Sequence, residues 1–351
     1  MEMIKQLQIN NYKSIKQLNL SCSRINVFIG KPNVGKSNIL EALDLSYLSW
    51  FMLMNKDREG EGREKINIKE YFRVNNPAQL FYLGDLSQPI SVKFFGFCPD
   101  DFITFNKENQ MNLFEWGTVN GKTQFDENFI PTAKTNERPS YFGSPIHPYR
   151  FKDNIQFHDS GNYFDTLMPP FGNNLANVIQ SNPHFRNFID DLTKDTGFEF
   201  NVDTVTNLVS VQLRIKKGLV YNVPYQALAD TIRRVIFSIA AIRTNNAHVI
   251  TLEEPESHSF PPYISMLADE IVEKIDRQFF IATHSPYLLN NLIENTPAED
   301  LSVFVCGYDK ENFQTTAKKL SREDLSELLD YGVDIFFNIN RYLDDRIEHN
   351  S

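Results

Sequence analysis

Apolar and polar residues alternate near the N-terminus, and this alternation then gives way to a continuous apolar run. The alternating segments 3–9 and 15–20 predict two half-buried strands separated by a short polar turn. The segment 25–29 is apolar except for Asn26, which predicts a strand buried on both faces. In 37–48 the apolar residues fall on one side of a helix, so strands are expected to lead through a glycine-containing turn into a helix.

The same succession of strands and helices returns in the last third of the chain. Apolar runs at 248–252 and 278–283 predict two further buried strands, and 301–305 with 313–318 predicts a terminal strand pair. Helices are predicted for 225–242, 262–275, 286–293, the aromatic segment 331–342, and a segment that Ser321 and Asp324 open as a capping box. This arrangement predicts an α/β core assembled from the two ends of the chain.

The section between these ends has a weaker pattern and is predicted to form an inserted α+β lobe. Residues 55–69 are dense in mixed charge and predict an exposed loop, while 80–130 holds short aromatic strand-like pieces such as 91–97. Apolar spacing predicts a helix over 174–196 and a strand pair over 198–216. The predicted divisions of the chain are 1–50, 51–220, 221–300 and 301–351.

Composition and charge narrow the classes of partner. The chain has 351 residues, with 35 basic and 45 acidic side chains and a formal net charge of −10, so any contact with DNA requires a local basic groove. The cysteines Cys22, Cys98 and Cys306 are widely spaced, which argues against a disulfide framework or a zinc site. No apolar run approaches the roughly 20 residues of a membrane span, so we expect a cytoplasmic protein without a membrane partner.

One glycine-containing turn carries a complete phosphate-binding motif. The residues that fit G-x-x-x-x-G-K-[ST] are Gly30, Lys31, Pro32, Asn33, Val34, Gly35, Lys36 and Ser37. A predicted buried strand precedes the motif and a predicted helix follows it, which is the context that phosphate binding requires. Backbone N–H groups and the helix N-terminus are expected to face the phosphates. Lys36 is expected to reach the outer phosphates, and the Ser37 hydroxyl to ligate Mg²⁺.

Two adjacent acids follow a second buried strand. Glu253 and Glu254 emerge at its C-terminal end, where ligands bind in open α/β sheets. Glu253 is expected to hold Mg²⁺, directly or through water, and Glu254, pointing the other way, to polarise the attacking water. His284 follows the third buried strand and is expected to donate a hydrogen bond to the terminal phosphate or to that water.

Together these segments resemble the ABC-type ATPase heads of the SMC, RecF and OLD (overcoming lysogenization defect) group. The resemblance lies in Tyr12-Lys13-Ser14-Ile15 after the first strand, the Walker A motif that continues into Asn38-Ile39-Leu40-Glu41-Ala42, the acidic Walker B run Glu253-Glu254-Pro255-Glu256, and Thr283-His284-Ser285-Pro286. It covers residues 1–50 and 220–295 and reaches the section between only loosely.

The resemblance implies a P-loop NTPase fold with a mixed central sheet and N-terminal antiparallel strands, and ATP with Mg²⁺ as cofactors. It adds Asn38 to the nucleotide-binding residues and implies catalytic roles for Lys36, Glu254 and His284. In this group two heads sandwich two ATP molecules and hydrolysis opens the dimer, so the resemblance also implies a homodimer or larger oligomer.

The chain departs from the family at the signature segment, which each head presents to its partner's nucleotide. The family pattern is a Ser followed shortly by Gly at a helix start, whereas this chain has Leu228-Ala229-Asp230-Thr231. Thr231 is expected to supply the missing hydroxyl, and Arg233 or Arg234 to reach across. The altered signature implies hydrolysis that is slow or depends on a partner.

The resemblance also implies a setting and leaves alternatives open. Heads without their own Toprim nuclease domain, as this chain is expected to be, work beside a separate effector such as a nuclease in DNA repair or anti-phage defence. The altered signature favours an alternative, an ATP-gated sensor or scaffold that hydrolyses little and holds an effector protein. A transporter subunit predicts an LSGGQ-like signature, and a P-loop kinase predicts neither Glu-Glu-Pro-Glu nor Thr-His-Ser-Pro, so both are weaker rivals.

Overall fold

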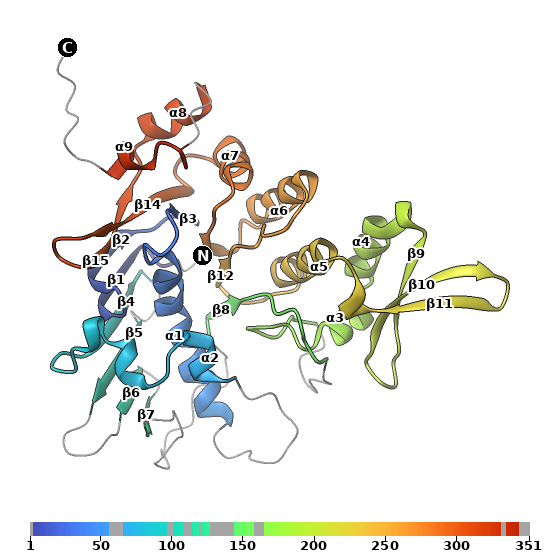
Figure 1. The fold of residues 1–351 in the computed structure, drawn as a ribbon, viewed down its shortest axis with the longest axis horizontal. Coiled ribbons are helices and arrows are strands. Elements are labelled where there is room, and N and C mark those ends of the chain that lie inside the picture. Colours follow the sequence, from blue (N-terminus) through green and yellow to red (C-terminus); the bar gives the residue numbers. More distant parts are fainter. Residues whose placement is uncertain are drawn as a thin grey trace. The chain divides into compact units, whose positions relative to one another are not determined.

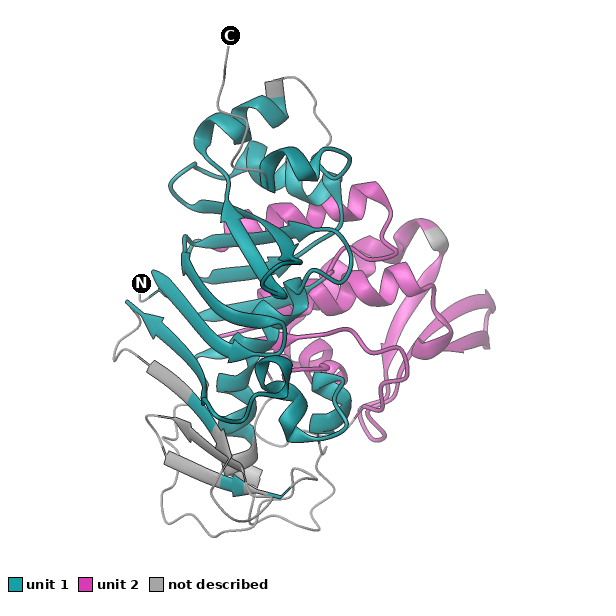
Figure 2. Cartoon of the chain, turned by 60° about the vertical axis from the view of Figure 1, so that its left-hand side comes forward, with its two compact units in different colours: residues 1–147, 247–253, 275–351 teal, residues 148–246, 254–274 magenta. Residues whose placement is uncertain are grey.

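The computed structural model describes residues 3–55, 66–96, 101–107, 114–118, 121–126, 144–157, 165–330 and 335–343 (Figure 1). The chain forms two compact units, coloured separately in Figure 2. Unit 1 comprises residues 1–147, 247–253 and 275–351, and unit 2 comprises 148–246 and 254–274. These boundaries differ from the predicted divisions of the chain.

One sheet of unit 1 is antiparallel, with the strand order β2-β1-β4-β5-β6-β7. Its strands are β1 (Gln6–Tyr12), β2 (Ile15–Ser21), β4 (Ile90–Phe95), β5 (Asp101–Lys107), β6 (Phe114–Thr118) and β7 (Gly121–Phe125). Leu7 and Ile9 of β1 are fully buried while their neighbours are half-buried, which confirms the predicted alternation. Because β4 pairs with β1, part of the section predicted as an inserted lobe extends the N-terminal sheet instead.

The second sheet is mixed, with the order β15-β14-β3-β13-β12-β8. Its strands are β3 (Ile25–Gly30), β8 (Ile146–Tyr149), β12 (Val249–Glu253), β13 (Gln278–Ala282), β14 (Leu301–Asp309) and β15 (Gln314–Lys319). Strands β14, β3, β13 and β12 run parallel to one another, and β15 is antiparallel to β14. Every residue of β3 and β13 is buried, as expected for parallel strands covered on both faces. The predicted mixed central sheet is confirmed.

The helix that follows the phosphate motif, α1 (Lys36–Asn55), contacts strands of both sheets. Apolar residues were predicted on one side of this helix, yet Ile39 and Leu48, which lie on opposite sides at 3.6 residues per turn, are both fully buried. Burial on both sides also encloses Glu41 and Asp44, each 1% exposed. These two carboxylates therefore need partners inside the unit.

The other helices of unit 1 are short. They are α2 (Ile68–Phe72), α7 (Pro286–Asn295), α8 (Arg322–Asp330) and α9 (Ile339–Leu343), with the 3-10 helices η1 (Pro77–Leu80) and η2 (Tyr82–Gly84). The predicted capping box of α8 is confirmed, because the Asp324 N–H donates to Ser321 Oγ at 3.0 Å and the Ser321 N–H donates to Asp324 Oδ2 at 2.9 Å.

Unit 2 combines an antiparallel sheet, ordered β11-β10-β9, with helices. Its elements are α3 (Leu175–Ser181), α4 (Pro183–Thr193), η3 (Lys194–Thr196), β9 (Phe198–Val202), β10 (Val209–Lys216), β11 (Leu219–Pro224), η4 (Tyr225–Ala227), α5 (Asp230–Arg243) and α6 (Pro261–Glu273). The predicted helix 174–196 divides at Pro183, which lacks an N–H, and the Asn182 side chain caps α4 by accepting from the Phe185 N–H at 3.0 Å. Strand β11 was not predicted.

Several segment predictions differ from the structure. The predicted helix 331–342 is wrong over 335–338, which form turns, and its first residues, 331–334, lie outside the described part of the chain. The predicted helix 225–242 starts as a 3-10 turn, and α5 begins only at Asp230. Of the predicted loop 55–69, residues 56–65 lie outside the described residues. Among the described residues, none of the helices has the length and apolar character that crossing a membrane demands.

Candidate functional site

The phosphate motif forms the turn between β3 and α1, and its first glycine lies against the neighbouring strand β14. A Cβ atom on Gly30 would come within 2.6 Å of the Cys306 carbonyl oxygen. Only glycine therefore lets β3 and β14 approach each other this closely while the chain leaves the sheet. Further along the turn, Asn33 is exposed and adopts a left-handed φ of 62°, and Pro32 is also exposed.

The second glycine of the motif is enclosed by two hydroxyl side chains. Gly35 has a φ of 98°, and a Cβ there would collide with Thr315 Oγ1 and come within 2.7 Å of Ser14 Oγ. The Thr315 hydroxyl donates to the Val34 carbonyl oxygen at 2.9 Å, and the two hydroxyl oxygens lie 2.6 Å apart. The Asn38 side chain completes this network by donating to Ser14 Oγ at 2.7 Å. The phosphate turn is thus held by Thr315 of β15 and by Ser14, which lies in the turn between β1 and β2.

Lys36 is buried under the turn that it follows. Its ammonium group donates to the carbonyl oxygens of Gly30 and Lys31 at 2.9 and 3.0 Å, and the residue is 6% exposed. The ammonium group therefore already points to the inner side of the motif. Phosphate oxygens bound there would be stronger acceptors than the two carbonyl oxygens. The Lys31 side chain points elsewhere and donates to Asn340 Oδ1 of α9 at 2.9 Å.

The strand register brings the predicted catalytic segments to one edge of the mixed sheet. Ala282 of β13 pairs with Phe28 of β3 on one side and with Glu253 of β12 on the other. The N–H of Thr283 then donates to the Phe28 carbonyl oxygen at 3.1 Å. Since the three strands are parallel, the phosphate turn, Glu253 and the half-buried His284 all leave the sheet at its C-terminal edge.

Glu253 lies at this edge with an ion-pair partner that the sequence reasoning missed. The Arg73 guanidinium donates through Nη2 to both carboxylate oxygens of Glu253, at 2.9 and 3.0 Å. Arg73 follows α2 in the chain and has no motif around it, so no local pattern indicated that it would meet the acid of β12.

The donor set at the edge fits a hard divalent cation. Ser37 is the second residue of α1 and Glu253 is the last residue of β12, and their side chains both supply oxygen. Mg²⁺ prefers oxygen ligands and commonly takes one or two from the protein and the rest from water and substrate phosphates. No group of three or more His, Cys, Asp or Glu side chains that suits a metal occurs among the described residues. The two oxygen donors Ser37 and Glu253 therefore suit Mg²⁺ that takes its other ligands from a nucleotide and water.

The remaining catalytic candidate, Glu254, comes directly after β12 and belongs to unit 2. Its backbone has a left-handed φ of 45°, which is uncommon for a residue with a side chain. Its carboxylate accepts a hydrogen bond from the Ser257 hydroxyl at 3.0 Å. Strained backbone at a non-glycine residue is a feature that clusters at functional sites.

The signature segment lies at the N-terminus of α5 in unit 2. The Thr231 hydroxyl donates to the His258 carbonyl oxygen. Asp230 accepts from Arg234 Nε at 2.8 Å and from Arg233 Nη2 at 3.2 Å. Burial opposes ionisation of Asp230, but the hydrogen bond from Arg234 and the charges of both arginines outweigh it and hold the pKa of this carboxyl below its usual value.

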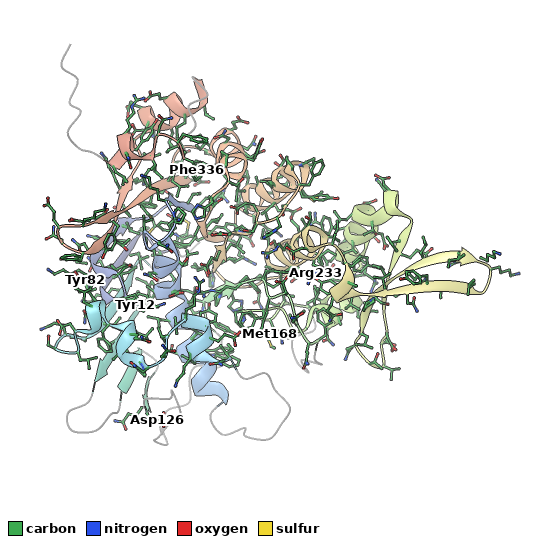
Figure 3. The ribbon with its side chains drawn as sticks, viewed as in Figure 1. Tyr12, Tyr82, Asp126, Met168, Arg233 and Phe336 are labelled. Atoms are coloured by element: carbon green, nitrogen blue, oxygen red, sulfur yellow. The ribbon has the colours of Figure 1, made fainter. Side chains whose placement is uncertain are left out.

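Both arginines of the segment are also held by other groups of unit 2. Arg233, labelled on α5 in Figure 3, is only 8% exposed and donates to the Asp153 carbonyl oxygen at 3.0 Å. The Arg234 guanidinium lies 4.4 Å from the centre of the Phe151 ring. The prediction that one of them reaches across to a partner's nucleotide therefore requires these contacts to break.

Two polar clusters tie α1 to its surroundings, and sequence reasoning missed both. Lys13 donates to the buried Glu41 carboxylate and to the Phe72 carbonyl oxygen. The hydroxyl of the neighbouring Tyr12, a residue labelled in Figure 3, also reaches Glu41, at 3.4 Å. Lys13 falls within the family-like Tyr12–Ile15 stretch, which was the one signal that could have found it. The second cluster, around Asp44, joins α1 to β12 and α2.

Comparison with known proteins identifies a matching family and two related proteins. The AAA ATPase domain family matches residues 3–215, more than half of the chain. A Helicobacter pylori protein named ATP/GTP phosphatase is 22% identical over 330 residues, covering 81% of this chain and 85% of that protein. An uncharacterised protein of Methanocaldococcus jannaschii is 30% identical over 129 residues, 36% of this chain and 56% of that protein.

A solved structure with a similar fold is the Smc head domain of Pyrococcus furiosus, which was crystallised with the C-terminal domain of ScpA. It superimposes with a TM-score of 0.51 and 12% identity, over 94% of this chain and 99% of that one. At this identity the likeness concerns the fold alone. The expected P-loop NTPase fold of the SMC-like ATPase heads is thereby confirmed.

Proposed function

The chain belongs to the AAA ATPase domain family, and from that premise we propose that it binds ATP with Mg²⁺ and hydrolyses it to ADP and phosphate. The observation that carries the proposal is the common edge at which the phosphate turn, Glu253 and His284 leave three parallel strands in register. The name of the Helicobacter pylori relative, ATP/GTP phosphatase, supports hydrolysis of a nucleoside triphosphate.

In this proposal each residue of the edge has a separate task. The backbone of residues 30–38 and the N-terminus of α1 bind the phosphates, and the Lys36 ammonium exchanges its two carbonyl acceptors for phosphate oxygens. Ser37 and Glu253 would hold Mg²⁺, and the bound cation would supply positive charge beside the transferred phosphoryl group. Glu254 polarises the attacking water and His284 donates a hydrogen bond to the terminal phosphate or to that water.

The first test is the effect of Lys36→Met on nucleotide binding. A charge-assisted hydrogen bond contributes about 1.5–3 kcal/mol, so ATP affinity should fall about 10- to 150-fold in an equilibrium titration and turnover should fall with it. Lys93→Met, on the exposed part of β4, is the matched control and should leave both unchanged. Unaltered ATP affinity in a folded Lys36→Met protein would contradict the assignment of this turn as the phosphate site.

The larger-scale part of the proposal rests on the resemblance to ATPase heads. We propose that ATP drives two or more copies together, that Thr231 faces the partner's nucleotide, and that the cycle serves DNA repair or anti-phage defence beside a separate, nuclease-like effector. DNA contact through a local basic groove belongs to the same proposal, because the net charge of −10 disfavours a general affinity for DNA. The assembly mass measured with and without ATP tests the first of these steps.

A second candidate function has its own supporting observation. At the start of α5, Asp230 adds a negative charge where an ATP sandwich would bring a phosphate, and both nearby arginines are engaged with it. The arginines held by Asp230 are then less available to a partner's phosphate, and the Asp230 carboxylate itself repels an anion at the helix N-terminus. This favours an ATP-gated sensor or scaffold with little hydrolysis, and turnover that stays negligible with DNA and effector present, while ATP still binds, would support it over the first candidate.

A further inference from the structure

The ion pair between Arg73 and Glu253 is unusual because it occupies the carboxylate that the proposed function assigns to Mg²⁺. The Glu253 side chain is 15% exposed, whereas the Arg73 side chain is 61% exposed. A single nitrogen, Nη2, contacts both oxygens of the acid. The pair therefore engages both oxygens through which Glu253 would bind a cation, using a side chain that is otherwise largely in solvent.

The backbone of Arg73 is fixed although its side chain is exposed. Arg73 ends α2 in a left-handed conformation, with φ 55° and ψ 43°, and its N–H donates to the carbonyl oxygens of Glu70 and Lys69. The two residues before it are anchored as well, since the Tyr71 hydroxyl donates to Asp44 at 2.7 Å and Lys13 donates to the Phe72 carbonyl at 2.6 Å. The position of the guanidinium beside Glu253 is thus set by the fixed backbone of Arg73, and not by packing of the side-chain methylene groups.

A buried carboxylate joins the two partners of the pair. Asp44 of α1 accepts from Tyr71, which precedes Arg73 by two residues, and from the Thr251 hydroxyl at 2.6 Å, which precedes Glu253 by two residues. The end of α2 and the end of β12 are therefore tied to the same side chain. This arrangement keeps the cation and the acid in register with each other inside unit 1.

We propose that Arg73 is the counter-cation of Glu253 in the metal-free protein, and that Mg²⁺ must displace it, so that Arg73 sets the Mg²⁺ concentration at which nucleotide binds. The inference rests on the proposed function, because it takes Glu253 as a metal ligand. Arg73 therefore opposes metal binding, because a carboxylate that is already paired with a guanidinium is a weaker ligand for a cation. Its exposed stem can leave without unpacking a core.

The test is the Mg²⁺ dependence of ATP affinity, measured by equilibrium titration with ATP over a series of Mg²⁺ concentrations. Removing a partly exposed ion pair should lower the Mg²⁺ concentration at half-saturation about two- to fivefold in Arg73→Gln, and Arg73→Lys should shift it less. ATP affinity without Mg²⁺ and the melting temperature report whether the variant is otherwise intact. Arg73→Gln with an unchanged or raised half-saturating Mg²⁺ concentration would overturn the inference.

Two controls separate this inference from the proposed function. Arg341→Gln removes another exposed pair, with Glu327, whose side chains are 51% and 29% exposed, and should not shift the Mg²⁺ dependence. In a Glu253→Gln background, Arg73→Gln should add nothing further. If wild-type ATP affinity does not depend on Mg²⁺, the assignment of Glu253 as a metal ligand fails, whereas a Mg²⁺-dependent wild type with an unshifted variant refutes only the role of Arg73.

Discussion

At the scale of single residues, the phosphate turn depends on two hydroxyl groups as much as on its own motif. Thr315 and Ser14 lie against Gly35, and Thr315 also fixes the Val34 carbonyl oxygen. The motif predicted the turn because its glycines, lysine and serine are adjacent in the chain. Thr315 lies 280 residues after Gly35 (315 − 35), and only strand pairing brings it close, so no local pattern could have indicated its role.

This close approach leads to a prediction for Gly35→Ala. The added Cβ collides with Thr315 and the left-handed φ of 98° strains alanine, so the free energy of unfolding should fall by about 1–3 kcal/mol and ATP affinity should fall too. Gly84→Ala is the matched control, because Gly84 has a φ of 73° but nothing within 4 Å of an added Cβ. Denaturant titration of both variants checks this, and equal losses would show that the hydroxyl contacts do not matter.

At the scale of elements, α1 is the clearest departure from the sequence pattern. Its apolar spacing predicted a one-sided helix, but sheets on both sides bury it, and its acids acquire partners from β12, α2 and the β1–β2 turn. A sequence pattern records which residues are apolar and not how many layers cover them. The buried strands β3, β12 and β13 were predicted correctly because continuous apolar runs mark strands covered on both faces.

The Asp44 cluster gives the prediction at this scale. Thr251→Val and Tyr71→Phe each remove a hydroxyl donor from a carboxylate that is 1% exposed, so each should lower the free energy of unfolding by about 1–3 kcal/mol. Thr193→Val is the control, since the Thr193 hydroxyl donates to a neutral acceptor, the Ile189 carbonyl oxygen of its own helix, at 3.0 Å, and its loss should cost less. Denaturation curves that match wild type for both cluster variants would refute this account of α1.

At the scale of the whole molecule, β3 from the N-terminal end shares the mixed sheet with β12, β13 and β14 from the last third of the chain, as the strand pattern predicted. The section between them was predicted as a single inserted lobe, yet β4 joins the N-terminal sheet and only residues from 148 onward in that section belong to unit 2, whose first segment extends to 246. The reason is that the sequence of a short aromatic strand does not indicate which neighbouring strand it will pair with. For β4 that neighbour is β1.

The central claim is that this chain hydrolyses ATP with Glu254 as the residue that activates water. The most direct measurement is the rate of ATP turnover by Glu254→Gln beside the wild type, with ATP affinity measured on the same samples. General base catalysis contributes about 10²- to 10⁴-fold, so turnover should fall by about 100-fold or more while ATP affinity stays within about twofold. Turnover equal to wild type in a Glu254→Gln protein that binds ATP normally would contradict the claim.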